Sequence, residues 1–362
     1  MATGTAVHFE VKRSDLHESR VVEDAQPDLD EGQALLRVDA FGFTSNNITY
    51  AAFGDAMKYW EFFPAPDGWG RIPVWGFADV VTSAHDELHE GARVYGYLPM
   101  STHVVVTPVR LDASGFVDAS PHRAQLPPAY NTYQYAGAGP AGDPAREAHR
   151  MLLWPLFFTS FLLDGYAADA GFWGAGTIVL SSASSKTALG TAFLLVERDD
   201  VEVVGLTSAA NTDFVESLGT YDQVVSYDDL SLLPSESAVY VDLSGDGEVR
   251  RAVHHRYGDN LAASLVVGAT HWDHGGGPAG ELPGPAPSFF FAPDQIRTRV
   301  REIGQEALDA ELGAAWTRFV EWTDGWFTIV RDDGPQAVET VYRDHLDGRI
   351  DASKGHVLSM WA

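Results

Sequence analysis

One segment of this 362-residue chain limits the fold more than any other. An apolar strand runs into small residues and then into a helix, in TIVLSSASSKTALG at 177–190. From there on, predicted strands alternate with predicted helices, and the further strands are expected at 201–208, 223–227, 238–245, 263–270 and 288–293. Such alternation is typical of a parallel sheet with helices on both faces. The sequence therefore predicts a doubly wound α/β sheet.

The flanking regions have other patterns. The first 110 residues contain short alternating segments punctuated by Gly and Pro, which indicate a small β-barrel. Residues 110–145, rich in Pro, Gly and Ala, are expected to form a connecting arm, followed by a helix at 145–168. Residues 294–323 have helical spacing, and GHVLSM at 355–360 is expected to be a final strand. The chain is long enough for two cores.

Composition argues against several classes of function. The formal net charge is −27, from 51 acidic and 24 basic residues, and such a surface repels nucleic acid and anionic membranes. A high-salt origin and an ordinary acidic bacterial protein both fit this charge. There is no apolar run of membrane-spanning length and no signal-peptide pattern, so we expect a soluble, cytoplasmic protein. The lack of cysteine excludes disulfides and thiolate metal sites.

The small residues after the strand at 177–181 suit a phosphate group. A helix N-terminus offers unpaired N–H groups and a partial positive charge, and small side chains let a ligand approach the backbone. We expect contacts from a loop that supplies hydroxyl groups and one positive charge: Ser182, Ser184, Ser185, Lys186 and Thr187.

Three interpretations of this loop remain open. A P-loop would need glycine at Leu180 and Ser185, and both glycines are missing. A dinucleotide fingerprint needs small residues three apart, which Ser182, Ser185 and Ala188 provide. The third interpretation is a plain strand-to-helix turn with a capping serine.

The next strand favours a dinucleotide, and NADP over NAD. In nicotinamide-binding folds a carboxylate at the end of this strand binds the ribose diol of NAD, whereas NADP needs that place free of acid. Here the strand ends in the neutral residues Thr207, Ser208 and Asn211, and the first acidic residue is Asp213. No arginine stands there to bind the 2′-phosphate.

The order of these segments resembles the medium-chain dehydrogenase/reductases, most closely their zinc-free quinone oxidoreductase and enoyl reductase branch. GQALLRVDAFGFTSNN resembles that family's opening strand and substrate-side turn, IPVWGFADVV its G-H-E-x-x-G segment, and TIVLSSASSKTALGTAFLL its cofactor loop. The S-K-T-A loop and VGATHWD resemble the subgroup DUF2855. The resemblance implies a GroES-like catalytic domain with the connecting arm (1–148), a Rossmann domain (149–291), and a C-terminal helix that returns to the catalytic domain (292–362).

The resemblance also implies where the chemistry takes place. It places the turn at 44–50 beside the nicotinamide, with Tyr50 as candidate proton donor and Asn46 and Asn47 as hydrogen-bond donors to a substrate oxygen. Further along, the segment 268–272 would contribute a catalytic His271, cofactor contacts from Gly268 and Thr270, and a pocket wall from Trp272. Alternatively, the two asparagines satisfy a turn and Tyr50 packs in the barrel.

The segment MKYWEFFPAPDGWG at 57–70 is dense in aromatic residues and lacks a helical or strand period. Tyr59 and Trp60 are therefore predicted to line an apolar substrate pocket. An aromatic cluster under a long loop, or a homodimer contact, explains the segment equally well.

A catalytic zinc is not expected. At the positions that bind zinc in related enzymes, this chain has Thr44 or Ser45, then Phe77 and Ala78, and apolar side chains cannot ligate zinc. His254 and His255 are expected on a helix surface, without a metal partner.

Together these observations predict an NADP(H)-dependent, zinc-independent reductase of an apolar carbonyl, enone or quinone. The alternative is a redox-silent protein that binds NADPH as a sensor or as a structural ligand.

Overall fold

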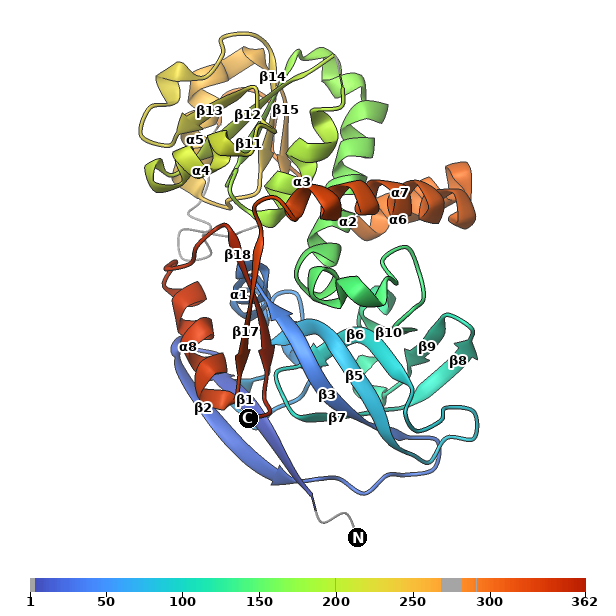
Figure 1. Ribbon diagram of the computed structural model, residues 1–362. Coiled ribbons are helices and arrows are strands. Elements are labelled where there is room, and N and C mark those ends of the chain that lie inside the picture. Colours follow the sequence, from blue (N-terminus) through green and yellow to red (C-terminus); the bar gives the residue numbers. More distant parts are fainter. Residues whose placement is uncertain (1–3, 199, 268–281, 291) are drawn as a thin grey trace. The chain divides into compact units, whose positions relative to one another are not determined.

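The computed structural model describes residues 4–198, 200–267, 282–290 and 292–362 (Figure 1). The chain divides into two compact units. Unit 1 comprises Met1–Trp154 and Phe327–Ala362, and unit 2 comprises Pro155–Trp326. The chain therefore leaves unit 1 once and returns to it near its C-terminus.

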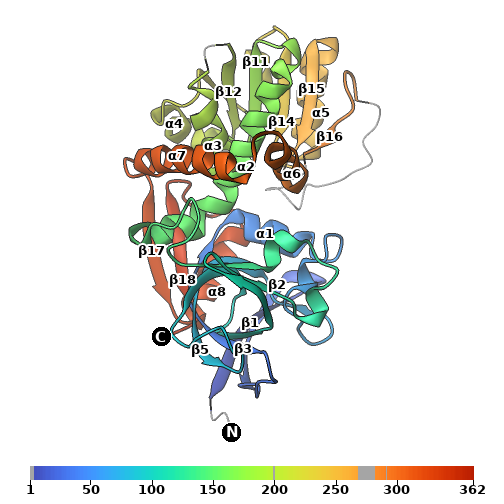
Figure 2. The same cartoon turned by 90° about the vertical axis from the view of Figure 1, so that its right-hand side faces the viewer.

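Unit 1 is β-rich, and Figure 2 shows its strands curving into a barrel. One sheet has the order β2-β1-β4, and the other the order β17-β18-β3-β5-β6-β10-β9-β8, with β7 paired to β3. The strands are β1 (Thr5–Lys12), β2 (Asp15–Ala25), β3 (Ala34–Phe43), β4 (Trp69–Gly70), β5 (Pro73–Ser83), β6 (Arg93–Pro99), β7 (His103–Val106), β8 (Pro108–Asp112), β9 (Gly115–Asp118), β10 (Thr132–Tyr135), β17 (Thr328–Asp333) and β18 (Lys354–Ser359).

The helices of unit 1 differ from the sequence prediction at one important point. Residues 44–50 do not form a turn, because helix α1 (Ser45–Ala52) begins there. The Thr44 N–H donates to Asn47 Oδ1 at 2.8 Å, which closes a capping box and starts the helix. A second helix, α8 (Pro335–Leu346), packs on β2, β17 and β18.

The predicted connecting arm at 110–145 was also wrong in part. It contains β9 and β10 and the end of β8, which extend the large sheet, while its Pro and Gly residues stand in the turns between them. The sequence predicts no element between 323 and 355, where β17 and α8 lie.

Helix α2 (Glu147–Asp169) follows the barrel strands. The stretch Pro144–Asp169 is long and apolar enough to cross a membrane, and half of its most apolar window is buried. Arg150 near its start is buried, and its guanidinium donates to the carbonyl oxygens of Ala136 and Ala138 and to Gln134 Oε1 at 2.7–3.2 Å. These contacts are typical of a core helix that also fixes the loop after β10.

Unit 2 contains the predicted doubly wound sheet. All neighbouring strands are parallel, in the order β13-β12-β11-β14-β15-β16, which is the 3-2-1-4-5-6 order of dinucleotide-binding sheets. The strands are β11 (Thr177–Ser181), β12 (Glu202–Thr207), β13 (Gln223–Ser226), β14 (Ala238–Asp242), β15 (Leu261–Val266) and β16 (Ser288–Phe289). The fold class predicted from the sequence is thereby confirmed.

Helices cover this sheet, and buried apolar clusters lie against it. The helices are α3 (Lys186–Leu195), α4 (Thr212–Ser217), α5 (Gly247–Tyr257), α6 (Ala292–Ile303) and α7 (Gln305–Thr323). Gly190 lets α3 approach α2, since a Cβ there would lie 2.8 Å from Ser160 Oγ. The predicted helical stretch 294–323 forms two helices, because Gly304 adopts a φ of 84° between them.

His8 on β1 makes the stability of unit 1 depend on pH. Its ring is buried, with Nδ1 2.7 Å from Ser101 Oγ. Burial and the charge of Arg71 lower the pKa of His8 to about 4 from its usual 6.5. The unfolded chain therefore takes up this proton at a higher pH than the folded chain. The folded state loses stability as pH falls through that window.

We expect His8→Gln to lose less stability than the parent chain between about pH 7 and about pH 4. The two losses of unfolding free energy should differ by on the order of 3 kcal/mol at most, which is the free energy that corresponds to the whole pKa shift of His8. Urea unfolding at several pH values measures it. Parallel stability curves for the two proteins would contradict this assignment.

Candidate functional site

The carboxyl end of β11 passes into a short loop that begins α3. Ser182 adopts a left-handed φ of 52°, and its N–H donates to Tyr227 Oη at 2.7 Å. Ser185 caps the helix, its Oγ accepting from the Ala188 N–H at 3.2 Å. Lys186 is the first residue of α3, whose first turn directs N–H groups away from the helix. This loop therefore has the geometry of an anion-binding helix start.

Asn211 connects this loop to the end of the neighbouring strand β12. Its Nδ2 donates to Ser184 Oγ and to Ser208 Oγ, each at 3.2 Å. Thr207 is the buried last residue of β12. The structure thus gathers eight of the predicted cofactor residues at one edge of the sheet: Ser182, Ser184, Ser185, Lys186, Thr187, Thr207, Ser208 and Asn211. Gly268 and Thr270 lie outside the described residues.

Two tyrosines that sequence reasoning missed hold the loop in place. Tyr227, directly after β13, accepts from Ser182, and Tyr221 Oη donates to the Ala183 carbonyl at 2.9 Å. Burial raises the pKa of both phenols, so both hydroxyls stay protonated. A usable signal was present, because QVVSY puts a tyrosine at the carboxyl end of the next parallel strand.

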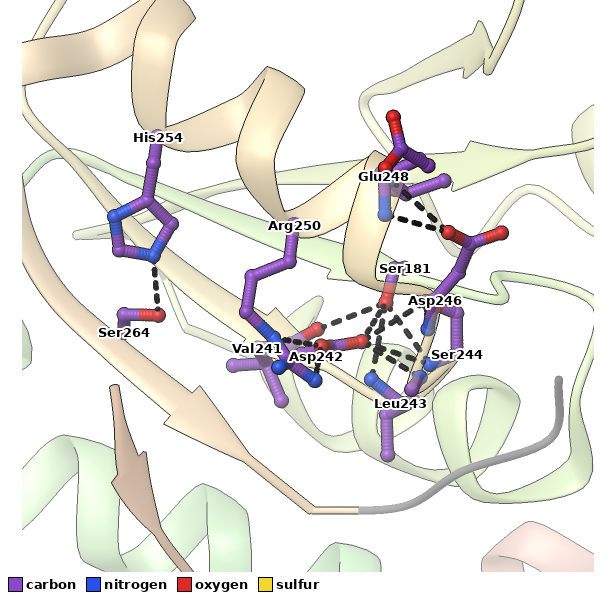
Figure 3. Close-up of polar contacts among 12 residues, drawn as sticks. Ser181, Val241, Asp242, Leu243, Ser244, Asp246, Glu248, Arg250, His254 and Ser264 are labelled. Carbon is purple, nitrogen blue, oxygen red and sulfur yellow. Dashed lines mark hydrogen bonds and ion pairs between the residues drawn. The ribbon is translucent and has the colours of Figure 1, made fainter. Parts of the chain in front are cut away.

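Asp242 lies where the strand order reverses, between β11 and β14 (Figure 3). Its buried Oδ2 accepts from Arg250 Nε at 2.7 Å and forms an ion pair with Nη2 at 2.6 Å. Its Oδ1 accepts from Ser181 Oγ at 3.2 Å and from the backbone N–H groups of Ser244 and Gly245 at 3.1 and 2.9 Å. Both oxygens of the carboxylate are therefore occupied, one by Arg250 and the other by Ser181 and the turn after β14.

His254 of α5 corrects another prediction, that it lies on a helix surface. It is fully buried, whereas His255 is exposed as expected. Its Nε2 lies 2.9 Å from Ser264 Oγ, and its Nδ1 lies 2.9 Å from the Pro283 carbonyl oxygen (Figure 3 shows the Ser264 contact). The ring can be buried because the chain satisfies both nitrogens.

In unit 1, Tyr50 joins an aromatic cluster. Its ring centroid lies 4.6 Å from that of Tyr59 and 5.7 Å from that of Tyr97, and only 6% of the residue is exposed. Burial and the neighbouring Tyr59 raise the pKa of Tyr50, against smaller opposite effects of Trp75, Asn46 and Tyr97. The phenol is therefore protonated at neutral pH.

The other candidates in unit 1 have structural contacts. Asn47 is buried, and its Nδ2 donates to the Pro73 carbonyl at 2.9 Å while its Oδ1 accepts from Thr44. Trp60 packs closely against two glycines, Gly54 and Gly70. Asn46 stands near the Tyr50 hydroxyl. His271 and Trp272 lie outside the described residues.

The positions that bind zinc in related enzymes carry no metal ligand here. Phe77 and Ala78 are fully buried in β5, and Thr44 caps α1. Within the part of the chain that the structure describes, no group of three or more His, Asp or Glu side chains could hold a metal ion.

Comparison with known proteins identifies the family. The family model described as "Protein of unknown function (DUF2855)" matches residues 41–351. The chain belongs to the DUF2855 family. No curated protein matches this DUF2855 chain in sequence.

Solved structures resemble the DUF2855 chain over nearly its whole length. CurA from Vibrio vulnificus is 12% identical with a TM-score of 0.61, covering 98% of both chains. The quinone oxidoreductase from Coxiella burnetii is 12% identical with a TM-score of 0.54, covering 98% of this chain and 99% of its own. The yhdH oxidoreductase from Salmonella enterica, solved with NADP, is 12% identical with a TM-score of 0.52, covering 97% and 99%. These likenesses confirm the medium-chain dehydrogenase/reductase fold.

The left-handed backbone at Ser182 gives a test of the loop in this DUF2855 chain. A serine Cβ is unfavourable at a φ of 52°, so Ser182→Gly should raise the free energy of unfolding by about 1 kcal/mol. Ser182→Val should lower it. Ser184→Gly is the matched control, because Ser184 has a negative φ and should gain nothing. If urea unfolding gives the same free energy of unfolding for Ser182→Gly and Ser184→Gly, the backbone at Ser182 is not strained.

Proposed function

We propose that this protein is an NADP(H)-dependent, zinc-independent reductase of an apolar carbonyl, enone or quinone. The observation that carries the proposal is the carboxyl edge of the parallel sheet in unit 2. There a small-residue loop, a helix start and a neutral end of β12 lie together at the point where the strand order reverses. NADPH or NADP bound to CurA and yhdH, two proteins of the same fold, supports this choice of cofactor.

The residues at this edge fit the phosphates of a dinucleotide. The start of α3 would hold the pyrophosphate through backbone N–H groups, the hydroxyls of Ser184 and Thr187, and the charge of Lys186. Asp242, a buried carboxylate that contacts Ser181 just before the loop, is paired with Arg250, so it would not repel a phosphate.

The end of β12 distinguishes between the two nicotinamide cofactors. A carboxylate there would bind the ribose diol of NAD and repel the 2′-phosphate of NADP. Thr207 and Ser208 are neutral, and Asp213 comes only within α4. We therefore assign NADP(H) as the cofactor.

NADPH, when bound, supplies a hydride, that is, two electrons and one hydrogen nucleus. The chain must bind the substrate, polarise its oxygen and allow one proton to be added, so that H⁻ and H⁺ together saturate the double bond. Tyr50 suits the last task, because burial keeps its phenol protonated. Asn46 lies near the same hydroxyl.

The redox-silent alternative also has support. Tyr50 is buried in the aromatic cluster, and Asn47 uses its amide on the backbone, as a purely structural role would require. Anaerobic mixing of the protein with NADPH and a panel of enones and quinones separates the two functions. A reductase consumes NADPH, whereas a sensor changes only the NADPH fluorescence.

The first prediction from the proposed function concerns Lys186. A charge-assisted contact with a cofactor phosphate is worth roughly 1.5–3 kcal/mol, so Lys186→Ala should weaken NADPH binding about ten- to a hundred-fold. Calorimetry measures the affinity. Lys354→Ala is the matched control, because Lys354 lies in unit 1 and pairs with Asp351. Unchanged affinity of Lys186→Ala would remove this lysine from the site.

The second prediction concerns Tyr50. Tyr50→Phe should reduce turnover of the best substrate of the panel by about 10²–10⁴, the usual value of a positioned proton donor. NADPH affinity should stay nearly constant, since the ring still packs. Tyr342→Phe serves as control, because its hydroxyl donates to the Leu16 carbonyl. Normal turnover of Tyr50→Phe would assign proton delivery to another group.

A further inference from the structure

Two hydrogen-bonding atoms inside the aromatic cluster of unit 1 form no well-aligned hydrogen bond with a described residue, although both groups lie close to the Tyr50 hydroxyl. They are Tyr97 Oη and Trp75 Nε1, both shielded from solvent. The two rings lie next to each other, with centroids 5.0 Å apart. Buried polar atoms in folded proteins are nearly always paired, and an unpaired one costs about 1–3 kcal/mol. Two such atoms in adjacent rings can both donate to one acceptor atom of a ligand.

Other aromatic rings surround these two atoms. The ring centroid of Tyr97 lies 4.7 Å from that of Tyr130, 5.2 Å from that of Phe62 and 5.7 Å from that of Tyr50. Trp75 and Tyr97 both lower the pKa of Tyr50 through side-chain contacts with its hydroxyl, so the three polar groups lie close together. Aromatic rings therefore enclose the two donor groups.

The charges around the cluster exclude an ionic ligand. The cluster itself consists of aromatic and apolar residues, namely Tyr50, Tyr59, Phe62, Phe63, Trp75, Tyr97, Val104, Leu126 and Tyr130. Arg123 lies close enough to act on Tyr97, but it forms an ion pair with Asp118 at 3.3 Å. A carboxylate or phosphate would find no unpaired cation among these groups.

We propose that Tyr97 Oη and Trp75 Nε1 together bind the carbonyl oxygen of a neutral, apolar aldehyde, ketone or enone. An indole N–H only donates, so the ligand atom that faces it must be an acceptor, which excludes amines and ammonium groups. The aromatic walls require an apolar body. The reaction at this site rests on the proposed function, whereas carbonyl binding can be measured without it.

The two donors also suit a reduction. Hydride addition to an enone moves electron pairs toward the carbonyl oxygen, which gains negative charge before a proton is added to carbon. Fixed donors in an apolar site stabilise such a charge more strongly than the starting carbonyl. Tyr97 and Trp75 are therefore assigned as catalytic residues that touch the substrate oxygen.

The test uses the full chain and cyclohex-2-enone labelled with ¹³C at the carbonyl, with NADP⁺ present so that no reduction occurs. Infrared difference spectroscopy should show the carbonyl band of the bound enone at lower frequency than in an apolar solvent. Tyr97→Phe and Trp75→Phe should each move the carbonyl band part of the way back to higher frequency. Each should also weaken enone binding roughly two- to tenfold. Tyr342→Phe and Trp361→Phe, which lose hydrogen bonds elsewhere in unit 1, should change neither value.

Several results would overturn the proposal. Binding of the enone to the parent chain without a shift of the carbonyl band, or no binding at all, would reject it. Neither measurement depends on the folding of a variant. Unchanged spectra in Tyr97→Phe and Trp75→Phe, or tighter binding of cyclohexanecarboxylate than of the enone, would also reject it. A shifted band in a protein that consumes no NADPH would support this site and reject the reductase. NADPH consumption together with an unshifted carbonyl band would support the reductase and reject this site.

Discussion

The ion pair between Asp242 and Arg250 sets the electrostatics of the carboxyl edge in unit 2. An unpaired carboxylate there would oppose a phosphate at the start of α3, and removing one partner of such a buried pair typically costs about 3–5 kcal/mol. The second carboxylate oxygen binds Ser181 and the turn after β14. One side chain therefore joins the ends of two parallel strands, and Arg250 compensates its charge, in a chain whose net charge is −27.

The loop after β11 reaches its shape without the glycines that usually allow a phosphate to approach. Ser182 takes the left-handed conformation itself, and the strain is offset by hydrogen bonds at both ends of the loop. Tyr227 accepts from the Ser182 N–H, and Tyr221 donates to the Ala183 carbonyl. Asn211 then fixes the position of Ser184 relative to β12. Because these partners come from the segments that flank the two neighbouring strands β12 and β13, the loop depends on those strands and not only on its local sequence.

The accuracy of the sequence predictions follows from how each element is buried. The strands of unit 2 were predictable because burial on both faces leaves apolar runs such as 177–181. Helix α1 was missed because Thr44 and Asn47 suit a turn as well as a capping box, and only the Asn47 contact with Pro73 decides. QVVSY placed Tyr227 at a strand end, but its contact with Ser182, 45 residues earlier, could not be read from local sequence. His254 was misplaced because its partner Ser264 lies on β15.

The aromatic cluster of unit 1 shows how burial and chemistry support each other. The segment 57–70 was expected to line a pocket, yet Phe62 and Phe63 from it are buried walls, and the polar atoms come from Trp75 on β5 and Tyr97 on β6. Burial raises the pKa of Tyr97 well above its usual value, so the phenol cannot ionise near neutral pH. A phenol that stays protonated is a permanent donor. The same apolar surroundings that would penalise an unpaired hydroxyl therefore strengthen its hydrogen bond to a ligand oxygen.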